Sequence, residues 1–172
     1  MTSRRAVLRT SAAVALGATA LISGADLAEA RSSTSPQRAR FEAQQCAEIE
    51  AVLNSYQRAL NASDVAGIVR LYTDDAVVLA PGAPSAVGSD AVRAAYTGIF
   101  QTIDIDLTFE IAEVKVVSPD WAFLRSTSHG VATILATGAQ VPSSNQELFV
   151  LRAGQGRWQL ARYSFSSVLP SA

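Results

Sequence analysis

The sequence has 172 residues, with 14 Lys or Arg and 15 Asp or Glu, so its formal net charge at pH 7 is −1. Lysine occurs only at Lys115 and there is no basic stripe, which argues against a nucleic-acid partner. One histidine and one cysteine cannot build a His- or Cys-rich metal site, and no calcium-loop, phosphate-loop or dinucleotide-binding motif is present. We therefore predict no metal, no cofactor and no nucleic acid.

Residues 1–30 have the features of a bacterial export signal. Paired arginines, Arg4 and Arg5, precede a short apolar stretch, and Ala28-Glu29-Ala30 has the small-x-small form of a signal-peptidase site. We predict export to the periplasm or beyond by the twin-arginine route. The apolar stretch is too short to span a bilayer, so no membrane span is expected after cleavage. A disordered basic tail or a retained anchor are the alternatives.

Three helical patterns follow a polar lead-in at residues 31–40, and they open a single domain over residues 41–170. Apolar residues recur at three and four over about Phe41–Ala62 and again over Val65–Tyr72. The run "AVVLAP" reads as a short strand that ends at Pro81. Asp74 and Asp75, just before it, are interpreted as turn residues, with a metal or surface role as the alternative. A third helix is expected after Ser89, with Tyr96 and Phe100 on its inner face.

After Gln101 the apolar period changes to two, which predicts strands at about 104–117, 121–136, 144–153 and 157–168. Three helices followed by an antiparallel meander predict an α+β fold with the helices on one face of a curved sheet. The other face is then exposed or paired with a second subunit, so we expect a homodimer through the sheet face.

The last hairpin gives a specific register prediction. A two-residue turn at Gly154-Gln155 would place Glu147 opposite Arg162 on the core side of the sheet. Because a buried unpaired charge is costly, the two side chains are expected to pair. They are either a structural ion pair or the polar lining of a pocket between helices and sheet.

His129 is the only histidine in the sequence, which makes it an acid–base candidate. A turn at Pro119-Asp120 would bring it opposite Glu110. The alternative is a surface or structural histidine.

The stretch Tyr56–Pro81, "YQRALNASDVAGIVRLYTDDAVVLAP", resembles the N-terminal half of the NTF2-like superfamily, a cone of three N-terminal helices packed on a curved antiparallel sheet. It is most similar to SnoaL-like and DUF4440-type members and to ketosteroid isomerase at the edge of the family. The segments "DWAFLRSTSHG" and "NQELFVLRAGQGRWQLARYSF" are similar to the meander of SgcJ/EcaC-type relatives. The resemblance covers residues 49–168 and implies the fold; it does not fix the function.

The resemblance to the isomerase carries over at one position and fails at another. Tyr56 stands five residues before Asn61, which matches the oxyanion-hole tyrosine of that enzyme. Its general base is an Asp immediately before the proline that ends the first strand, and here that position is Ala80. Whether the protein is an enzyme is therefore open.

We expect an exported domain with a pocket for a small, largely apolar ligand. An enzyme that uses His129 or Glu147 as a proton carrier (an isomerase, cyclase or SgcJ/EcaC-type oxidoreductase-like protein) is one alternative, and a non-catalytic association module is another. The predicted pocket residues are Tyr56, Tyr72, Tyr96, Phe100, Phe123, Asn145, Glu147, Phe149, Trp158 and Arg162.

Overall fold

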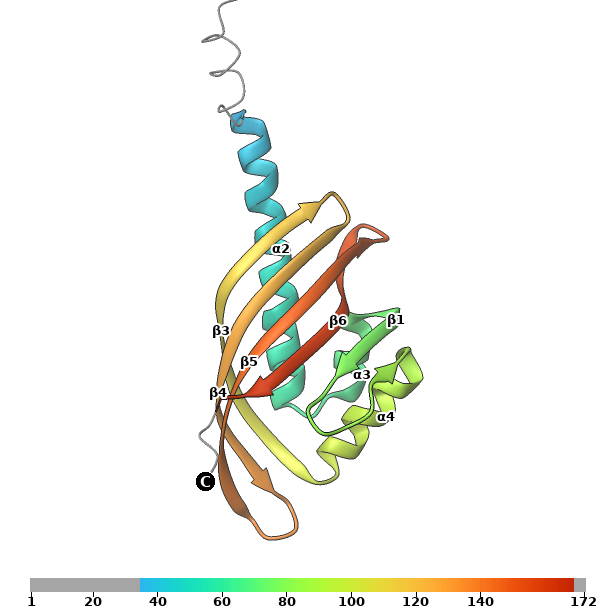
Figure 1. The fold of residues 1–172 in the computed structure, drawn as a ribbon, viewed down its shortest axis with the longest axis vertical. Helices are drawn as coiled ribbons and strands as arrows, with labels where there is room; N and C mark the ends of the chain where they lie inside the picture. The colour runs from blue at the N-terminus through green and yellow to red at the C-terminus, as the bar shows by residue number, and fades with distance from the viewer. Residues whose placement is uncertain (1–34, 169–172) are drawn as a thin grey trace, which may run out of the picture. The chain divides into compact units, whose positions relative to one another are not determined.

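The computed structural model describes residues 35–168, so the predicted export signal at residues 1–30 lies outside the described part of the chain. That part begins with helices α2 (Pro36–Asn61) and α3 (Val65–Leu71), strands β1 (Tyr72–Leu79) and β2 (Ala86–Val87), and helix α4 (Ser89–Phe100). Four long strands follow: β3 (Ile103–Ser118), β4 (Trp121–Ile134), β5 (Ala139–Gly154) and β6 (Arg157–Ser167). Three helices lie on one face of a curved sheet, which confirms the predicted fold class (Figure 1).

Helix α2 buries one face along its C-terminal half, at Ile49, Leu53, Tyr56 and Leu60, as the apolar period predicts. It begins at Pro36, so residues 36–40, which we assigned to the flexible lead-in, are helical instead. Proline suits the first turn of a helix, because its fixed φ is already helical and no N–H bond is lost there.

The second helix is shorter than predicted, and the first strand begins earlier. Asp64 caps α3 by accepting a hydrogen bond from the Gly67 N–H at 2.8 Å. Helix α3 ends at Leu71, and Asp74 and Asp75 lie inside β1 rather than in a turn before it. Asp75 accepts two hydrogen bonds from the Arg152 guanidinium, at 2.9 and 3.1 Å, on the exposed side of the sheet. This aspartate therefore ties β1 to β5.

The six strands form one sheet in the order β2-β1-β6-β5-β4-β3. Strands β3 to β6 are the predicted antiparallel meander, whereas β1 runs parallel to β6. At Gly130 in β4 a Cβ atom would overlap the backbone oxygen of Asp106 in β3. Only glycine allows the two strands to approach this closely.

The predicted register of the β5–β6 hairpin is wrong. Its turn residues are Gln155 and Gly156, both with positive φ (52° and 76°), so the turn is of type I′ and lies one residue later than we expected. The register also shifts between the pairs Leu151–Leu160 and Val150–Arg162, which leaves Ala161 as an extra residue on β6. After this bulge the faces of β6 are exchanged: Glu147 pairs with Phe165, and Arg162 points to the outer face.

The β3–β4 hairpin turns at Pro119-Asp120 as predicted, with Ser118 opposite Trp121. Two register shifts in β3 then move the later pairs, so that His129 lies opposite Thr108 rather than Glu110. His129 is exposed on the outer face of the sheet, where strand alternation places the residue that follows buried Ser128.

Strand β3 is the long free edge of the sheet, and helix α2 covers part of it. The Asn61 side chain donates to the Leu107 carbonyl at 2.9 Å and accepts from the Leu107 N–H at 3.1 Å. The Gln57 side chain accepts from the Phe109 N–H at 2.9 Å. Two amide side chains of the helix thus take the place of a neighbouring strand over this part of the edge.

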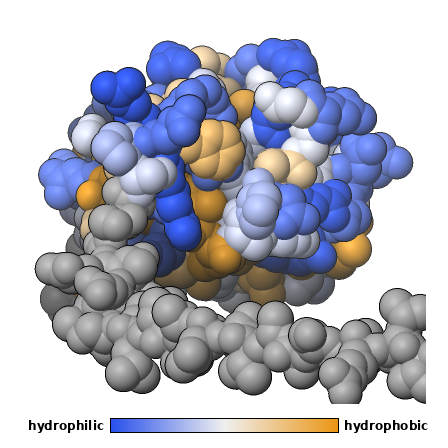
Figure 2. Space-filling view, turned by 90° about the horizontal axis from the view of Figure 1, so that it is seen from above, coloured by the Kyte–Doolittle hydropathy of each residue, from blue (hydrophilic) through white to orange (hydrophobic). Residues whose placement is uncertain are grey.

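An aromatic cluster fills the layer between helix α2 and the sheet. The Tyr56 ring meets Phe109, Phe149 and Tyr163 edge-on, with ring centroids 5.6–5.8 Å apart. Phe149 and Tyr163 stack at 4.3 Å. Seen from above, hydrophobic residues show in the middle of the described part, and hydrophilic residues lie to either side of them (Figure 2).

Candidate functional site

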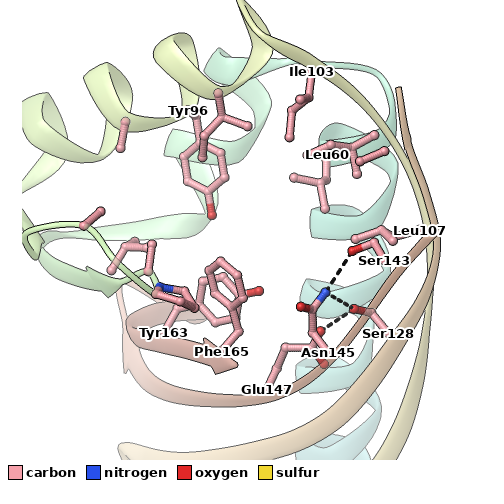
Figure 3. Close-up of a pocket in the computed structure, with 18 of the residues that line it drawn as sticks. Leu60, Tyr96, Ile103, Leu107, Ser128, Ser143, Asn145, Glu147, Tyr163 and Phe165 are labelled. Atoms are coloured by element: carbon pink, nitrogen blue, oxygen red, sulfur yellow. Dashed lines mark hydrogen bonds between the residues drawn. The ribbon is translucent and has the colours of Figure 1, made fainter. Parts of the chain in front are cut away.

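A cavity of about 580 Å³ lies between the helices and the concave face of the sheet. Its size falls in the range of small-molecule sites, about 300–1,000 Å³. One side is formed by α2, α4 and the loop after β1, and the other by β3, β4, β5 and β6 (Figure 3). Most of the lining is apolar, with Leu60, Val78, Ile99, Ile105, Leu107, Phe109 and Phe165 among its members.

Three tyrosine hydroxyls form a chain at the helical side of the cavity. The Tyr96 hydroxyl lies 2.8 Å from the Tyr56 hydroxyl and 2.9 Å from the Tyr72 hydroxyl. All three residues are buried, and Tyr56 and Tyr96 line the cavity whereas Tyr72 does not. Figure 3 shows the Tyr96 hydroxyl pointing into the open space.

Burial keeps these hydroxyls protonated. Desolvation raises the pKa of Tyr96 to about 12, against the lowering effect of its bonds to Tyr56 and Tyr72. Desolvation by burial also raises the pKa of Tyr56 and that of Tyr72 well above the usual value of tyrosine. At neutral pH the three tyrosine hydroxyls are therefore neutral hydrogen-bond donors rather than phenolates.

Glu147 lies at the sheet side of the cavity and is 5% exposed. Its carboxylate accepts hydrogen bonds from the Ser126 hydroxyl at 2.7 Å and the Ser128 hydroxyl at 2.5 Å. Within residues 35–168 it takes part in no salt bridge, so the predicted pair with Arg162 does not form. Arg162 instead donates to the backbone carbonyls of Asp75 and Ala161. Burial raises the pKa of Glu147, and the two serine bonds oppose that rise.

The structure brings together four of the predicted pocket residues, and the others lie elsewhere. Tyr56, Tyr96, Asn145 and Glu147 line the cavity. Behind this layer, Tyr72 bonds to Tyr96 and Phe100 packs against it, while Phe149 and Trp158 belong to the buried core. Two predictions place side chains on the wrong face of the sheet. Arg162 is on the outer side because of the bulge at Ala161, and Phe123 is there because its neighbours Ala122 and Leu124 are the buried residues of β4.

The SnoaL-like domain family matches residues 52–160 of the chain. The chain belongs to this family. A crystal structure of a ketosteroid isomerase-like protein from Erwinia carotovora atroseptica SCRI1043 is 43% identical, with a TM-score of 0.71 over 73% of this chain and 98% of that one. A conserved protein from Planctomyces limnophilus DSM 3776 is 27% identical, with a TM-score of 0.63 over 70% of this chain and 95% of that one.

An NTF2-like protein of unknown function from Shewanella oneidensis MR-1 shares the fold at 18% identity, with a TM-score of 0.56 over 69% of this chain and 96% of that one. A comparison with curated proteins gives no match. The predicted membership of the NTF2-like superfamily, with its cone of helices on a curved, unclosed sheet, is confirmed.

Ala80 of this SnoaL-like domain lines the cavity. We identified this position from the proline that follows it as the place of the isomerase base. The methyl group cannot accept a proton, so the cavity has no acid–base group there.

Several cavity residues were not predicted from the sequence. Ser128 and Ser143 contribute hydroxyls, and Tyr163 and Phe165 contribute rings beyond the bulge at Ala161. Ser128 and Asn145 form a cross-strand pair on the face of Glu147, and this pairing becomes visible only once the register of β4 and β5 is known.

Two kinds of feature concern metal binding and membrane insertion in the described part of the chain, namely clusters of metal-ligating side chains and membrane-spanning helices. No group of three or more His, Cys, Asp or Glu side chains gathers within residues 35–168 in a way that could hold an ion. None of the helices in that range is both long and apolar enough to cross a bilayer.

Proposed function

We propose that this SnoaL-like domain binds a small, largely apolar ligand in the cavity and donates one tyrosine hydrogen bond to an oxygen of that ligand. The observation that carries the proposal is the proton count of the tyrosine chain. Three hydroxyls bring three protons, and the two bonds Tyr56–Tyr96 and Tyr96–Tyr72 use two of them. One O–H group is left over.

The remaining proton belongs on the cavity side. The Tyr72 hydroxyl is buried outside the cavity and its partners are the Tyr96 and Tyr56 hydroxyls, so a proton that Tyr72 donates to either of them leaves the cavity-facing hydroxyls to donate elsewhere. Tyr56 or Tyr96 therefore carries it toward the cavity. Tyr163 also lines the cavity, and including it does not change the number of unused protons. If the Tyr163 hydroxyl accepted a bond from Tyr56, its own proton would be the one without an acceptor. A carbonyl or hydroxyl oxygen of the ligand is the natural acceptor.

Binding is favoured over isomerase-type catalysis because of Ala80. The similarity to a ketosteroid isomerase-like protein suggests a related ligand shape, but the mechanism of ketosteroid isomerase itself needs a base where this chain has a methyl group. His129 is exposed on the outer face and does not line the cavity.

A catalytic role is the second candidate, and it rests on Glu147. A carboxyl group in an apolar cavity, without a cation and with its pKa raised by burial, has the properties of a general acid or base. Glu147→Gln would then abolish turnover of a ligand while leaving its binding intact.

Binding is tested with the neutral fluorescent probe N-phenyl-1-naphthylamine. The site for a blocking variant is Gly98, which lines the cavity and where an added Cβ meets no atom within 4 Å. Gly98→Phe should reduce probe affinity at least tenfold. Thr97→Phe, at the neighbouring exposed position that does not line the cavity, is the matched control and should change it little. Equal affinity in both variants would place the probe outside the cavity.

The tyrosine donor is tested by competition against the same probe. A ketone, 2-acetylnaphthalene, should bind about 2- to 10-fold more tightly than 2-ethylnaphthalene, which is the range given by one net hydrogen bond. The double variant Tyr56→Phe/Tyr96→Phe removes both cavity-facing hydroxyls of the tyrosine chain and should reduce that ratio, whereas Tyr56→Phe alone leaves a donor on Tyr96. A ratio of one in the wild type would refute the donor.

We also propose that the protein is exported and forms a homodimer through the outer face of the sheet. The sequence of residues 1–30 supports export, and replacing Arg4 and Arg5 with lysine should retain the protein in the cytoplasm.

Exposed apolar residues on the long strands, including Val117 and Leu148, support the dimer. Leu148→Glu should then halve the mass measured by light scattering.

A further inference from the structure

The sheet side of the cavity carries a row of polar residues from two neighbouring strands, which we call the polar strip: Ser126 and Ser128 of β4 and Ser143, Asn145 and Glu147 of β5. Ser126 pairs with Glu147 and Ser128 with Asn145 in the sheet register. Side chains two residues apart on a strand share a face, so the whole strip faces the helices. Ser128, Ser143, Asn145 and Glu147 line the cavity.

The amide of Asn145 is oriented by two hydroxyls. Its Nδ2 donates to the Ser128 hydroxyl oxygen and to the Ser143 hydroxyl oxygen, each at 3.3 Å. These two bonds use both N–H groups of the amide. The side-chain oxygen Oδ1 is therefore the group left for a ligand, and Figure 3 shows the amide at the edge of the open space.

Two of the three serine hydroxyls of the strip also donate within it. The Ser126 hydroxyl donates to one carboxylate oxygen of Glu147, and the Ser128 hydroxyl donates to the other. What the strip offers to the cavity is thus two acceptor groups, Asn145 Oδ1 and the remaining lone pairs of the Glu147 carboxylate, and one donor, the Ser143 hydroxyl. The tyrosine chain on the opposite side of the cavity offers a hydrogen-bond donor to a ligand, whereas Asn145 Oδ1 on the polar strip offers an acceptor.

We propose that Asn145 Oδ1 accepts a hydrogen bond from a hydroxyl or N–H group of the ligand, so that the cavity takes apolar molecules that carry a donor as well as an acceptor oxygen. This inference rests on the proposed function and narrows its ligand class. A ligand without the donor would cover Asn145 Oδ1 and take it from water without replacing the hydrogen bond, which disfavours that ligand. Hydroxylated or amino-substituted ring systems fit this requirement, whereas bare ketones and hydrocarbons meet only part of it.

The experiment compares three competitors of N-phenyl-1-naphthylamine that differ at one substituent: 2-naphthol, 2-methoxynaphthalene and 2-methylnaphthalene. In the wild-type protein 2-naphthol should bind about 3- to 10-fold more tightly than either of the other two, as expected for one net hydrogen bond. In Asn145→Leu, which keeps the approximate size of the side chain, this preference should disappear or reverse. Gln146→Leu, at the neighbouring exposed position of β5 that does not line the cavity, is the matched control and should keep the preference.

Two results would overturn the inference: competitors that bind equally to the wild type, or a preference for 2-naphthol that survives in Asn145→Leu. The wild-type comparison needs no variant, so the inference can be refuted even if Asn145→Leu does not fold. If the probe and all three competitors fail to bind, the proposed function itself fails and this inference falls with it. If they bind without preference, only the role of Asn145 is lost.

Discussion

The tyrosine chain makes a quantitative prediction about stability, because its central member serves both neighbours. Tyr96→Phe keeps the ring but removes the hydroxyl that bonds to Tyr56 at 2.8 Å and to Tyr72 at 2.9 Å. Two net hydrogen bonds contribute about 1 kcal/mol each, and the orphaned hydroxyl of Tyr72 adds a desolvation cost of about 1–3 kcal/mol. Tyr56 loses less, since it lines the cavity and water can reach it. Together these contributions predict a loss of about 3–5 kcal/mol in the free energy of unfolding.

The hydroxyl of Tyr72, at one end of the tyrosine chain, should contribute less to the free energy of unfolding than the hydroxyl of Tyr96. Tyr72→Phe removes one bond and orphans nothing, because Tyr96 still bonds to Tyr56 and faces the cavity, so the expected loss is about 1 kcal/mol. In the double variant the orphan is gone, so adding Tyr72→Phe to Tyr96→Phe should cost nothing or recover stability. Urea unfolding followed by the fluorescence of buried Trp158 measures all three. Additive losses, or equal losses in the two single variants, would refute the assignment of Tyr96 as the hub.

Three further predictions concern other parts of the domain. Gly98→Ala should raise the free energy of unfolding by up to about 1 kcal/mol in urea titrations, because the helical position has room for a Cβ; a loss of stability would contradict this. Burial raises the pKa of Glu147, so the folded state holds the carboxyl proton more tightly than the unfolded state does. The protonated carboxyl group therefore stabilises the fold at low pH, and this contribution to the free energy of unfolding is lost as pH rises through the folded pKa. Glu147→Gln should therefore gain stability relative to the wild type between pH 4 and pH 7, and a pH-independent difference in urea unfolding would contradict the shift. Asn61→Ala should lose about 1–2 kcal/mol with its two bonds to Leu107, whereas the exposed Asn54→Ala control on the same helix should stay within about 0.5 kcal/mol.

The helices could be predicted from the sequence because each buries one face. Ile49, Leu53, Tyr56 and Leu60 repeat with the helical period, and all four are buried in the structure. The end of α3 was harder to place, since Tyr72 continues the helical spacing from Ile68 and is also a buried residue of β1. Burial alone does not tell the last turn of a helix from the first residue of a strand.

The site was only partly predictable, because a one-residue bulge reverses every later side chain. Our assignment of inner residues on β6 is correct up to Leu160. Beyond Ala161 we predicted Arg162 on the inner face, whereas the structure has Tyr163 there. Ser126-Thr127-Ser128 and Asn145-Gln146-Glu147 are polar at every position, so alternation of polarity gives no sign of which face is buried. Contacts across the sheet decide it, and those depend on a register that the sequence does not state.

The bonds between helix α2 and the edge of β3 have a consequence for the behaviour of the protein in concentrated solution. A free edge of 16 residues is a template on which a strand of another molecule could pair and start aggregation. Asn61 and Gln57 occupy three of its backbone groups, and the register shifts near Glu113 and Ser118 interrupt the rest. Outward charges at Asp104, Asp106 and Glu110 repel a second copy of the same edge. The same two amides that fix the helix to the sheet therefore also protect the domain from polymerising through its edge.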